Sequence, residues 1–190
     1  MNKTIQTFIT VFISFVLSGQ MRAFAEDMMS SRETVPTTKE IEEAAKDPAK
    51  KEEYGKVLLS IFVDKHEPLK KKIECALALG RLKYLPAIPR LIEFIELQHP
   101  IGTIFSESAI EIQYPCVRAL ADYGEAAASS IVEAYAKEEN KTRQRLLRAV
   151  VRIGKTHKAA IAFAEKLLSE KADDTTQARL KALVDNLMKP

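Results

Sequence analysis

The sequence predicts an all-α fold, an α-solenoid of about three to four antiparallel helix pairs arranged as a superhelix. Apolar residues recur at helical spacing, and no stretch around the first helix pair alternates with the period of a strand. A unit of two helices joined at a glycine and a short turn is also repeated. Its copies are Cys75–Ile95, Ala119–Tyr135 and Ala149–Ala164. Because one pair cannot bury its own apolar stripe, neighbouring pairs are expected to share a continuous core.

The N-terminal residues 1–25 have the pattern of a secretory signal peptide. Met1–Lys3 is positively charged, Ile5–Leu17 is a mostly apolar run, and Ala23-Phe24-Ala25 is a small-x-small cleavage site. A membrane anchor is the alternative, but the run is shorter than the roughly 20 residues that span a bilayer. We therefore expect cleavage after Ala25, export to the periplasm or secretion, and no stable membrane insertion afterwards.

Removal of residues 1–25 would leave a chain that is nearly neutral. These residues include Lys3 and Arg22 and no acidic residue, so the 29 Lys and Arg of the whole chain fall to 27 against 26 Asp and Glu. A formal net charge of +1 argues against general binding to nucleic acid or to anionic lipid.

The first helices are expected directly after a flexible lead-in at residues 26–36, where the solenoid domain 37–190 begins. Thr37 followed by Glu40 is a capping box, which predicts a short helix through about Lys46. Asp47-Pro48 then supplies an N-cap and a first helical residue. The next helix carries an apolar stripe at helical spacing, formed by Tyr54, Val57, Leu58, Ile61 and Phe62.

Glycine and proline mark the turn of the first complete unit. Pro68 opens its first helix, and Gly80 is expected to end that helix in the left-handed conformation, which glycine adopts without a Cβ penalty. Pro86 and Pro89 suit the first turn of the returning helix, where a missing backbone N–H costs nothing.

Residues 98–113 interrupt the repeat. This insertion is too long for a usual helix–helix connection of about 2–8 residues and too apolar for a simple linker. Part of it is either a helix that runs into Pro115 with a kink, or a packed loop laid over the solenoid. It is a candidate for a specific role, and a plain cover for one repeat is the alternative.

After the insertion the helical pattern resumes, and Gly124 and Gly154 are expected to follow helix ends. Asn140 is expected to cap the helix before Gly154, and Thr156 the helix after it. Asp173 or Asp174 opens a terminal helix whose apolar stripe consists of Leu180, Leu183, Val184, Leu187 and Met188.

The units resemble HEAT repeats, in particular the short bilin-lyase-like kind. Ala78–Gly80 followed by Ala87–Ile92 is the closest copy. Gly124–Ala134 is similar to a compact variant, with Ser129 where that variant usually has proline. Arg148–Gly154 keeps the first-helix pattern but lacks the proline afterwards.

The resemblance extends over roughly Lys50–Met188 and implies an α-solenoid. It implies no activity, because the motif residues of HEAT repeats are packing residues and no catalytic set carries over.

Cys75 and Cys116 are the two cysteines, and both fall in first helices of successive units. In an exported protein they could form a disulfide across a helix–helix contact. The alternative is that they are two small buried thiols at tight packing positions.

The sequence indicates no catalytic, cofactor-binding or metal-binding residues. His66, His99 and His157 lie far apart, without a second His or Cys at metal-ligand spacing. His99 has the only notable surroundings, since Glu96, Glu107 and Glu111 are nearby in the chain. The sequence also lacks a Gly-x-Ser-x-Gly elbow, a phosphate-binding glycine loop and Cys-x-x-Cys.

One side of the helix after Asn140 is basic. Arg145, Arg148 and Arg152, with Lys141, fall near that side and could engage an acidic partner or a phosphate group. A solvated outer face is the alternative interpretation.

The expected function is that of an exported, non-catalytic scaffold or adaptor that binds another protein, rather than that of an enzyme. The alternative, by analogy with lyases on similar repeats, is a lyase- or chaperone-like protein that handles a cofactor or client. A nucleic-acid enzyme is opposed by export and charge. The expected partner-binding residues lie on the second helices of the units: Arg90, Glu93, Glu133, Lys137, Glu165 and Lys166.

Overall fold

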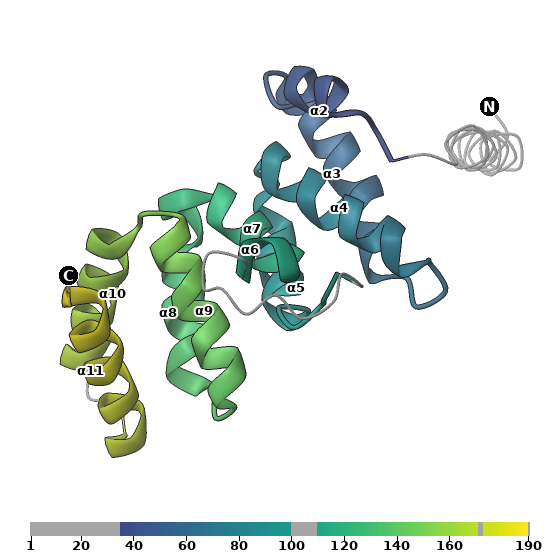
Figure 1. The fold of residues 1–190 in the computed structure, drawn as a ribbon. Helices are drawn as coiled ribbons and strands as arrows, with labels where there is room; N and C mark the ends of the chain where they lie inside the picture. The colour runs from purple at the N-terminus through teal and green to yellow at the C-terminus, as the bar shows by residue number, and fades with distance from the viewer. Residues whose placement is uncertain (1–34, 100–109, 171–172, 190) are drawn as a thin grey trace, which may run out of the picture. The chain divides into compact units, whose positions relative to one another are not determined.

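Helices account for most of the chain that the computed structural model describes, which is residues 35–99, 110–170 and 173–189 (Figure 1). No strand occurs in those ranges, so the predicted all-α class is confirmed. The α-helices are α2 (Thr38–Ala44), α3 (Pro48–Val63), α4 (Leu69–Leu82), α5 (Ile88–Glu93), α6 (Ile110–Gln113), α7 (Pro115–Asp122), α8 (Ala128–Lys137), α9 (Lys141–Ile153), α10 (His157–Ser169) and α11 (Asp174–Met188), with the 3₁₀ helices η1 (Leu85–Ala87) and η3 (Gly124–Ala127).

The helices of the unit Pro36–Pro190 pack in two series. In the first, α3 packs on α4, α4 on α7, and α7 on α9. In the second, α5 contacts α8 and α8 contacts α10, while α11 covers α8 and α10 (Figure 1). Each repeated unit contributes its first helix to one series and its second helix to the other.

Four predicted helix starts are confirmed, because the side chain of the N-cap residue accepts a hydrogen bond from a backbone N–H of the first turn. At α2 the capping box is complete, since Thr37 N donates to Glu40 Oε2 at 2.7 Å and Glu40 N donates to Thr37 Oγ1 at 3.4 Å. Three later helices begin with the same kind of bond, from Asp47, Asn140 and Asp173.

Thr156 occupies the N-cap position of α10, but it does not cap that helix with its side chain. Its hydroxyl is buried and lies 3.5 Å from the carbonyl oxygen of Val151 in the preceding helix. The predicted position is therefore right and the predicted hydrogen bond is wrong.

Gly80 does not end its helix, so that prediction is wrong. Helix α4 continues to Leu82, and Lys83 adopts the left-handed conformation with φ 51° and ψ 47°. Gly80 instead lies where α4 meets α7. A Cβ atom at Gly80 would stand 2.6 Å from Ala119 Cα and 2.7 Å from Ala119 O, so only glycine allows these two helices to approach so closely.

The two later glycines do follow helix ends, as predicted. Gly124 comes two residues after the end of α7 and has φ 62°, the left-handed cap that favours glycine. Gly154 caps α9 with a right-handed backbone, and the left-handed residue is its neighbour Lys155.

Tyr123 joins the C-terminal end of α7 to that of α4. Its hydroxyl lies 2.8 Å from the carbonyl oxygen of Tyr84 and 3.1 Å from that of Leu79, and it donates its one proton within this pair. Both carbonyls also accept from backbone N–H groups, Leu79 O from Lys83 and Tyr84, and Tyr84 O from Ala87, so the hydroxyl adds a bond between the two helix ends. Burial raises the pKa of the Tyr123 phenol well above its usual range, so it stays a donor.

The apolar core lies between the two series of helices. The ring centroids of Phe62 in α3 and Phe94 after α5 are 5.3 Å apart in an edge-to-face contact. The largest fully buried side chains come from both series and from both terminal helices: Phe62, Ile41, Leu58, Leu79, Leu82, Leu91, Ile95, Leu120, Ile131, Leu146, Leu147 and Leu180.

The described end of the insertion is helical. Helix α6 covers Ile110–Gln113, and Tyr114 breaks it with φ −118° before α7 starts at Pro115. This part matches the first of the two alternatives, a helix that runs into Pro115 with a kink. Residues 100–109 of the insertion lie outside the described residues.

Replacement of Gly80 by alanine is expected to destabilise the protein more than the same change at Gly124. At Gly80 the new methyl group meets backbone atoms of α7, which cannot rotate away, so we expect a loss of about 2 kcal/mol or more. At Gly124 no atom lies within 4 Å and only left-handed strain opposes alanine, about 1 kcal/mol. Urea denaturation of both variants measures the difference, and equal losses would contradict the close approach.

Candidate functional site

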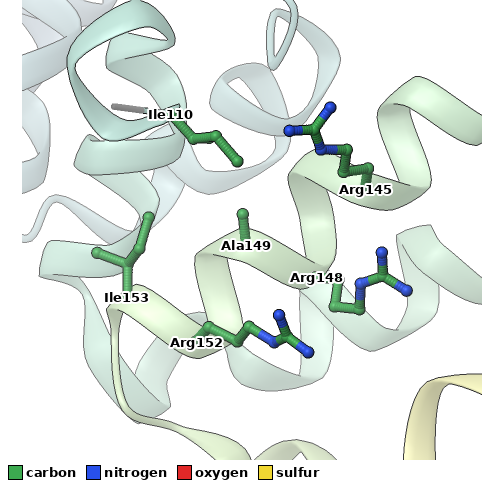
Figure 2. A pocket seen from close by; sticks show the side chains of 6 residues that line it. All are labelled: Ile110, Arg145, Arg148, Ala149, Arg152 and Ile153. Atoms are coloured by element: carbon green, nitrogen blue, oxygen red, sulfur yellow. The ribbon is translucent and has the colours of Figure 1, made fainter. Parts of the chain in front are cut away.

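A hollow lies on the face of α9 that looks toward α6 (Figure 2). It encloses about 400 Å³, open solvent included. Figure 2 shows Ala149 between two isoleucines on one side and the arginine side chains on the other. The lining residues are Ile110, Arg145, Arg148, Ala149, Arg152 and Ile153.

Helical geometry places the three arginines together. Arg145, Arg148 and Arg152 are three and four residues apart, so they follow one side of α9 over successive turns. The opposite side carries the buried residues Leu146, Leu147 and Val150, which hold the helix against the core. The side chain of Arg145 is consequently exposed, as is that of Arg152, and Arg148 is half-buried.

No carboxylate of the described residues pairs with the arginines of the hollow. Arg152 donates only a long bond of 3.4 Å to the carbonyl oxygen of Asn186, and Arg145 and Arg148 have no hydrogen bond or ion pair within the described ranges. Like charges on adjacent turns repel one another by a few tenths of a kcal/mol. Within the described residues, the hollow is therefore a site of concentrated positive charge without a carboxylate partner.

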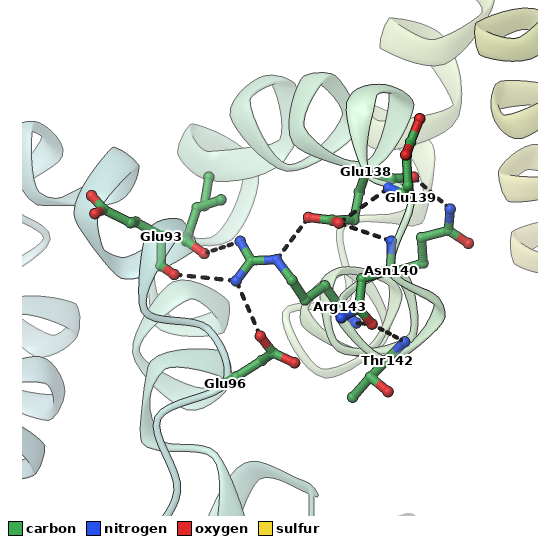
Figure 3. Close-up of polar contacts among 9 residues, drawn as sticks. Glu93, Glu96, Glu138, Glu139, Asn140, Thr142 and Arg143 are labelled. Atoms are coloured by element: carbon green, nitrogen blue, oxygen red, sulfur yellow. Dashed lines mark hydrogen bonds and ion pairs between the residues drawn. The ribbon is translucent and has the colours of Figure 1, made fainter.

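Arg143, on the same helix, has a different role (Figure 3). Its guanidinium donates to Glu138 Oε2 at 2.7 Å and to the carbonyl oxygens of Ile92 and Glu93, both at 3.2 Å. A weaker contact of 3.4 Å reaches Glu96 Oε2. Ile92 O also accepts from the backbone N–H groups of Phe94 and Ile95, so Arg143 adds a bond from α9 to the last turn of α5.

Glu138 completes this cluster at the end of α8. Its Oε1 atom accepts from the backbone N–H groups of Glu139 and Asn140 at 3.1 and 3.0 Å. Burial opposes the ionisation of Glu138, but the hydrogen bond from Arg143 and the backbone bonds outweigh it and lower the pKa of the carboxyl group. Arg143 and Glu138 are thus a charged clamp between α5, α8 and α9.

The six predicted partner-binding residues are all exposed, on the three second helices α5, α8 and α10. Arg90 and Glu93 form an exposed ion pair of 2.5 Å, which contributes little stability. Lys166 lies 3.9 Å from Glu170 and over the Phe163 ring. Within the described ranges, no hydrogen bond or ion pair joins the residues of one second helix to those of the next. The predicted set comprises Arg90, Glu93, Glu133, Lys137, Glu165 and Lys166.

The acidic neighbours of His99 have other partners. Glu96 faces Arg143, and Glu111 accepts from Arg118 at 2.6 Å. Glu107 lies outside the described residues. Nδ1 of His99 has no hydrogen-bond partner within the described ranges, and its backbone N–H donates to Gln113 O at 2.9 Å. No group of three or more His, Cys, Asp or Glu residues suited to a metal ion occurs in the part of the chain described.

Cys75 and Cys116 are free thiols in the structure, on the adjoining helices α4 and α7. Both side chains are fully buried, and burial raises the pKa of each thiol to about 12. No disulfide joins them in this structure, and the pairing of Cys75 with Cys116 in the exported protein stays a prediction.

Sequence reasoning grouped the three arginines correctly by helical spacing but missed two features of the site. It did not connect Ile110 to α9, and it did not single out Arg143. The partners of Arg143 on α5 are about fifty residues away in the chain, at separations of 50 and 51. A local pattern carries no signal for contacts at that separation.

Comparison of the chain with protein-family profiles, curated proteins and solved structures finds no match. The resemblance to HEAT repeats thus stays a prediction. None of the helices in the described ranges is both long and apolar enough to cross a membrane.

Replacement of Glu138 by glutamine is expected to cost about 1–3 kcal/mol at pH 7, because a charged hydrogen bond to Arg143 is lost. The pKa of Glu138 is lowered by folding, so its stabilisation is present above the unfolded pKa near 4.3 and disappears as pH falls through the folded value. Chemical denaturation should show that the free energies of unfolding of the wild-type protein and of Glu138→Gln differ at pH 7 and become similar at pH 3. Glu133→Gln, at an exposed position, is the control, and a pH-independent gap would contradict the assignment.

Thiol titration tests the state of the two cysteines. In the folded protein at pH 8 both should react slowly, since burial keeps them protonated and inaccessible. In denaturant without reductant, two thiols per chain should be released. A result of zero thiols would show that Cys75 and Cys116 are bonded in the native protein.

Proposed function

We propose that this chain is an exported, non-catalytic protein with a HEAT-like α-solenoid that acts as a scaffold or adaptor for another protein. The support for a solenoid is the serial packing of equivalent helices, α4 to α7 to α9 and α5 to α8 to α10. The support for export is the signal-peptide pattern of residues 1–25.

The observation that carries the proposal is the exposure of charged residues on helices that contact one another in series. Helices α5 and α8 each present two exposed charged side chains and α10 presents three, and both signs occur on each helix. Stacked repeats of this kind offer extended surfaces on which another protein binds through many side chains. Mixed charges set the specificity and the orientation of such a partner.

The chemistry around the hollow favours binding over catalysis. Its lining offers arginine and aliphatic side chains, which can hold an anion but supply no nucleophile and no general base near neutral pH. The buried thiols also lack the depressed pKa that a cysteine nucleophile needs.

Charge reversal on α8 tests the proposal. The tagged chain is purified from the exported fraction, and one protein should co-purify in a fixed ratio. Glu133→Lys with Lys137→Glu should reduce its recovery about fivefold or more, since attractive contacts become repulsive. Lys181→Glu with Asp185→Lys on α11 is the matched control, because it has the same spacing, exposure and net charge change.

Recovery of a bound pigment or metal without a protein partner would overturn the scaffold in favour of the lyase- or chaperone-like alternative. Equal loss of the partner in both double variants would show that α8 is not part of the binding face. Circular dichroism of each variant confirms that the helices are intact.

A further inference from the structure

We propose that the hollow on α9 binds an acidic segment of the partner protein, in which an apolar side chain is flanked by carboxylates. This inference rests on the proposed scaffold function and names the chemistry of its partner. Arginine is suited to the role because its planar guanidinium accepts a carboxylate through two parallel hydrogen bonds.

The positive charge of the hollow is available to a ligand. Four of the five other arginines in the described ranges pair with a carboxylate, and the fifth, Arg81, donates to Thr38 Oγ1 at 2.8 Å. Arg118 pairs with Glu111 and Asp122, at 2.6 and 3.2 Å, and Arg179 lies 3.4 Å from Glu139. Arg90 and Arg143 also pair with carboxylates. The arginines at positions 145, 148 and 152 are different, because they lie on one side of one helix and no described carboxylate lies within ion-pair distance of any of them.

The spacing of the arginines fits a short peptide. Positions 145 and 152 are seven residues apart on one helix, which corresponds to roughly 10 Å along its axis. An extended peptide covers that length in about three residues, and a helical peptide in about two turns. Two or three carboxylates of one segment can therefore meet the three guanidinium groups at the same time.

The apolar part of the lining favours a ligand that carries an apolar side chain as well as carboxylates. Ile110 from α6 and Ala149 are buried, and Ile153 is half-buried beside them (Figure 2). An aliphatic side chain of the ligand would cover these groups and exclude water from the neighbouring ion pairs. An ion pair is stronger when water is excluded from it.

Nucleic acid fits the hollow less well than a peptide does. The lining contains no aromatic side chain on which a base could stack. Three arginines neutralise few phosphates compared with the 6–10 contacts typical of DNA-binding proteins. The net charge of +1 on residues 26–190 adds no general attraction to a polyanion.

Fluorescence anisotropy with labelled peptides tests the inference, on the chain in the form that accumulates in the cell. The probe is a 12-residue peptide with a central leucine and three glutamates spaced three to four residues apart. One matched peptide has glutamine in place of each glutamate, and a second has serine in place of the leucine. We expect the first peptide to bind, and each matched peptide to bind about tenfold more weakly or not at all.

Protein variants locate the binding to the hollow. Arg145→Gln combined with Arg148→Gln and Arg152→Gln should lower the affinity by about tenfold or more. A control variant removes the same charge from exposed positions in α10, in α11 and directly after α11, by Lys158→Gln, Lys181→Gln and Lys189→Gln. The affinity of this variant should change less than twofold. Arg145→Gln alone guards against misfolding of the triple variant, because this exposed side chain has no partner in the described structure, and it should still weaken binding severalfold.

Three results would overturn the inference. The first is equal binding of the acidic peptide and its glutamine analogue. The second is equal loss of binding in the arginine and lysine triple variants. The third is tighter binding of a phosphorylated peptide, single-stranded DNA or vesicles of anionic phospholipid, which would assign the hollow to phosphate groups.

The native partner separates this inference from the scaffold proposal. If a partner co-purifies and depends on Glu133 and Lys137 but not on the three arginines, the scaffold stands and the acidic-peptide site is wrong. If the acidic peptide binds the hollow and no protein co-purifies, the site stands and the scaffold proposal is wrong.

Discussion

The contact between α4 and α7 fixes the arrangement of the described helices. At Gly80 the two helices approach so closely that the backbone of Ala119 occupies the place of a side chain. Tyr123 then bonds back to the carbonyl groups at the end of α4. Because α9 packs on α7, the position of the arginine-lined face depends on this one close approach.

A charged clamp positions α9 at its other end. Arg143 joins the first turn of α9 to the last turn of α5 and to Glu138 after α8. Its side chain is 22% exposed, so water screens these bonds less than those of a surface pair. In α9, Arg143 thus stabilises the fold, whereas Arg145, Arg148 and Arg152 have no carboxylate partner in the described structure. That division is the reason for treating α9 as a binding helix.

Most helix starts were predictable and the candidate site was predictable in part. The caps of Thr37, Asp47, Asn140 and Asp173 follow from bonds to residues two or three positions ahead. The common side of Arg145, Arg148 and Arg152 follows from the helical period alone. The hollow itself was not predictable, because Ile110 reaches it from a separate helix at the end of the insertion.

The sequence by itself determined the all-α class, the helix starts and the basic side of α9, since each depends on residues within one or two turns of one another. Only the tertiary structure decided the roles of Gly80 and Arg143 and the presence of the hollow. Gly80 illustrates the reason: glycine permits both a left-handed helix end and a close helix contact, and the choice depends on Ala119, thirty-nine residues later. Contacts at that separation are set by how the helices pack, which local spacing does not encode.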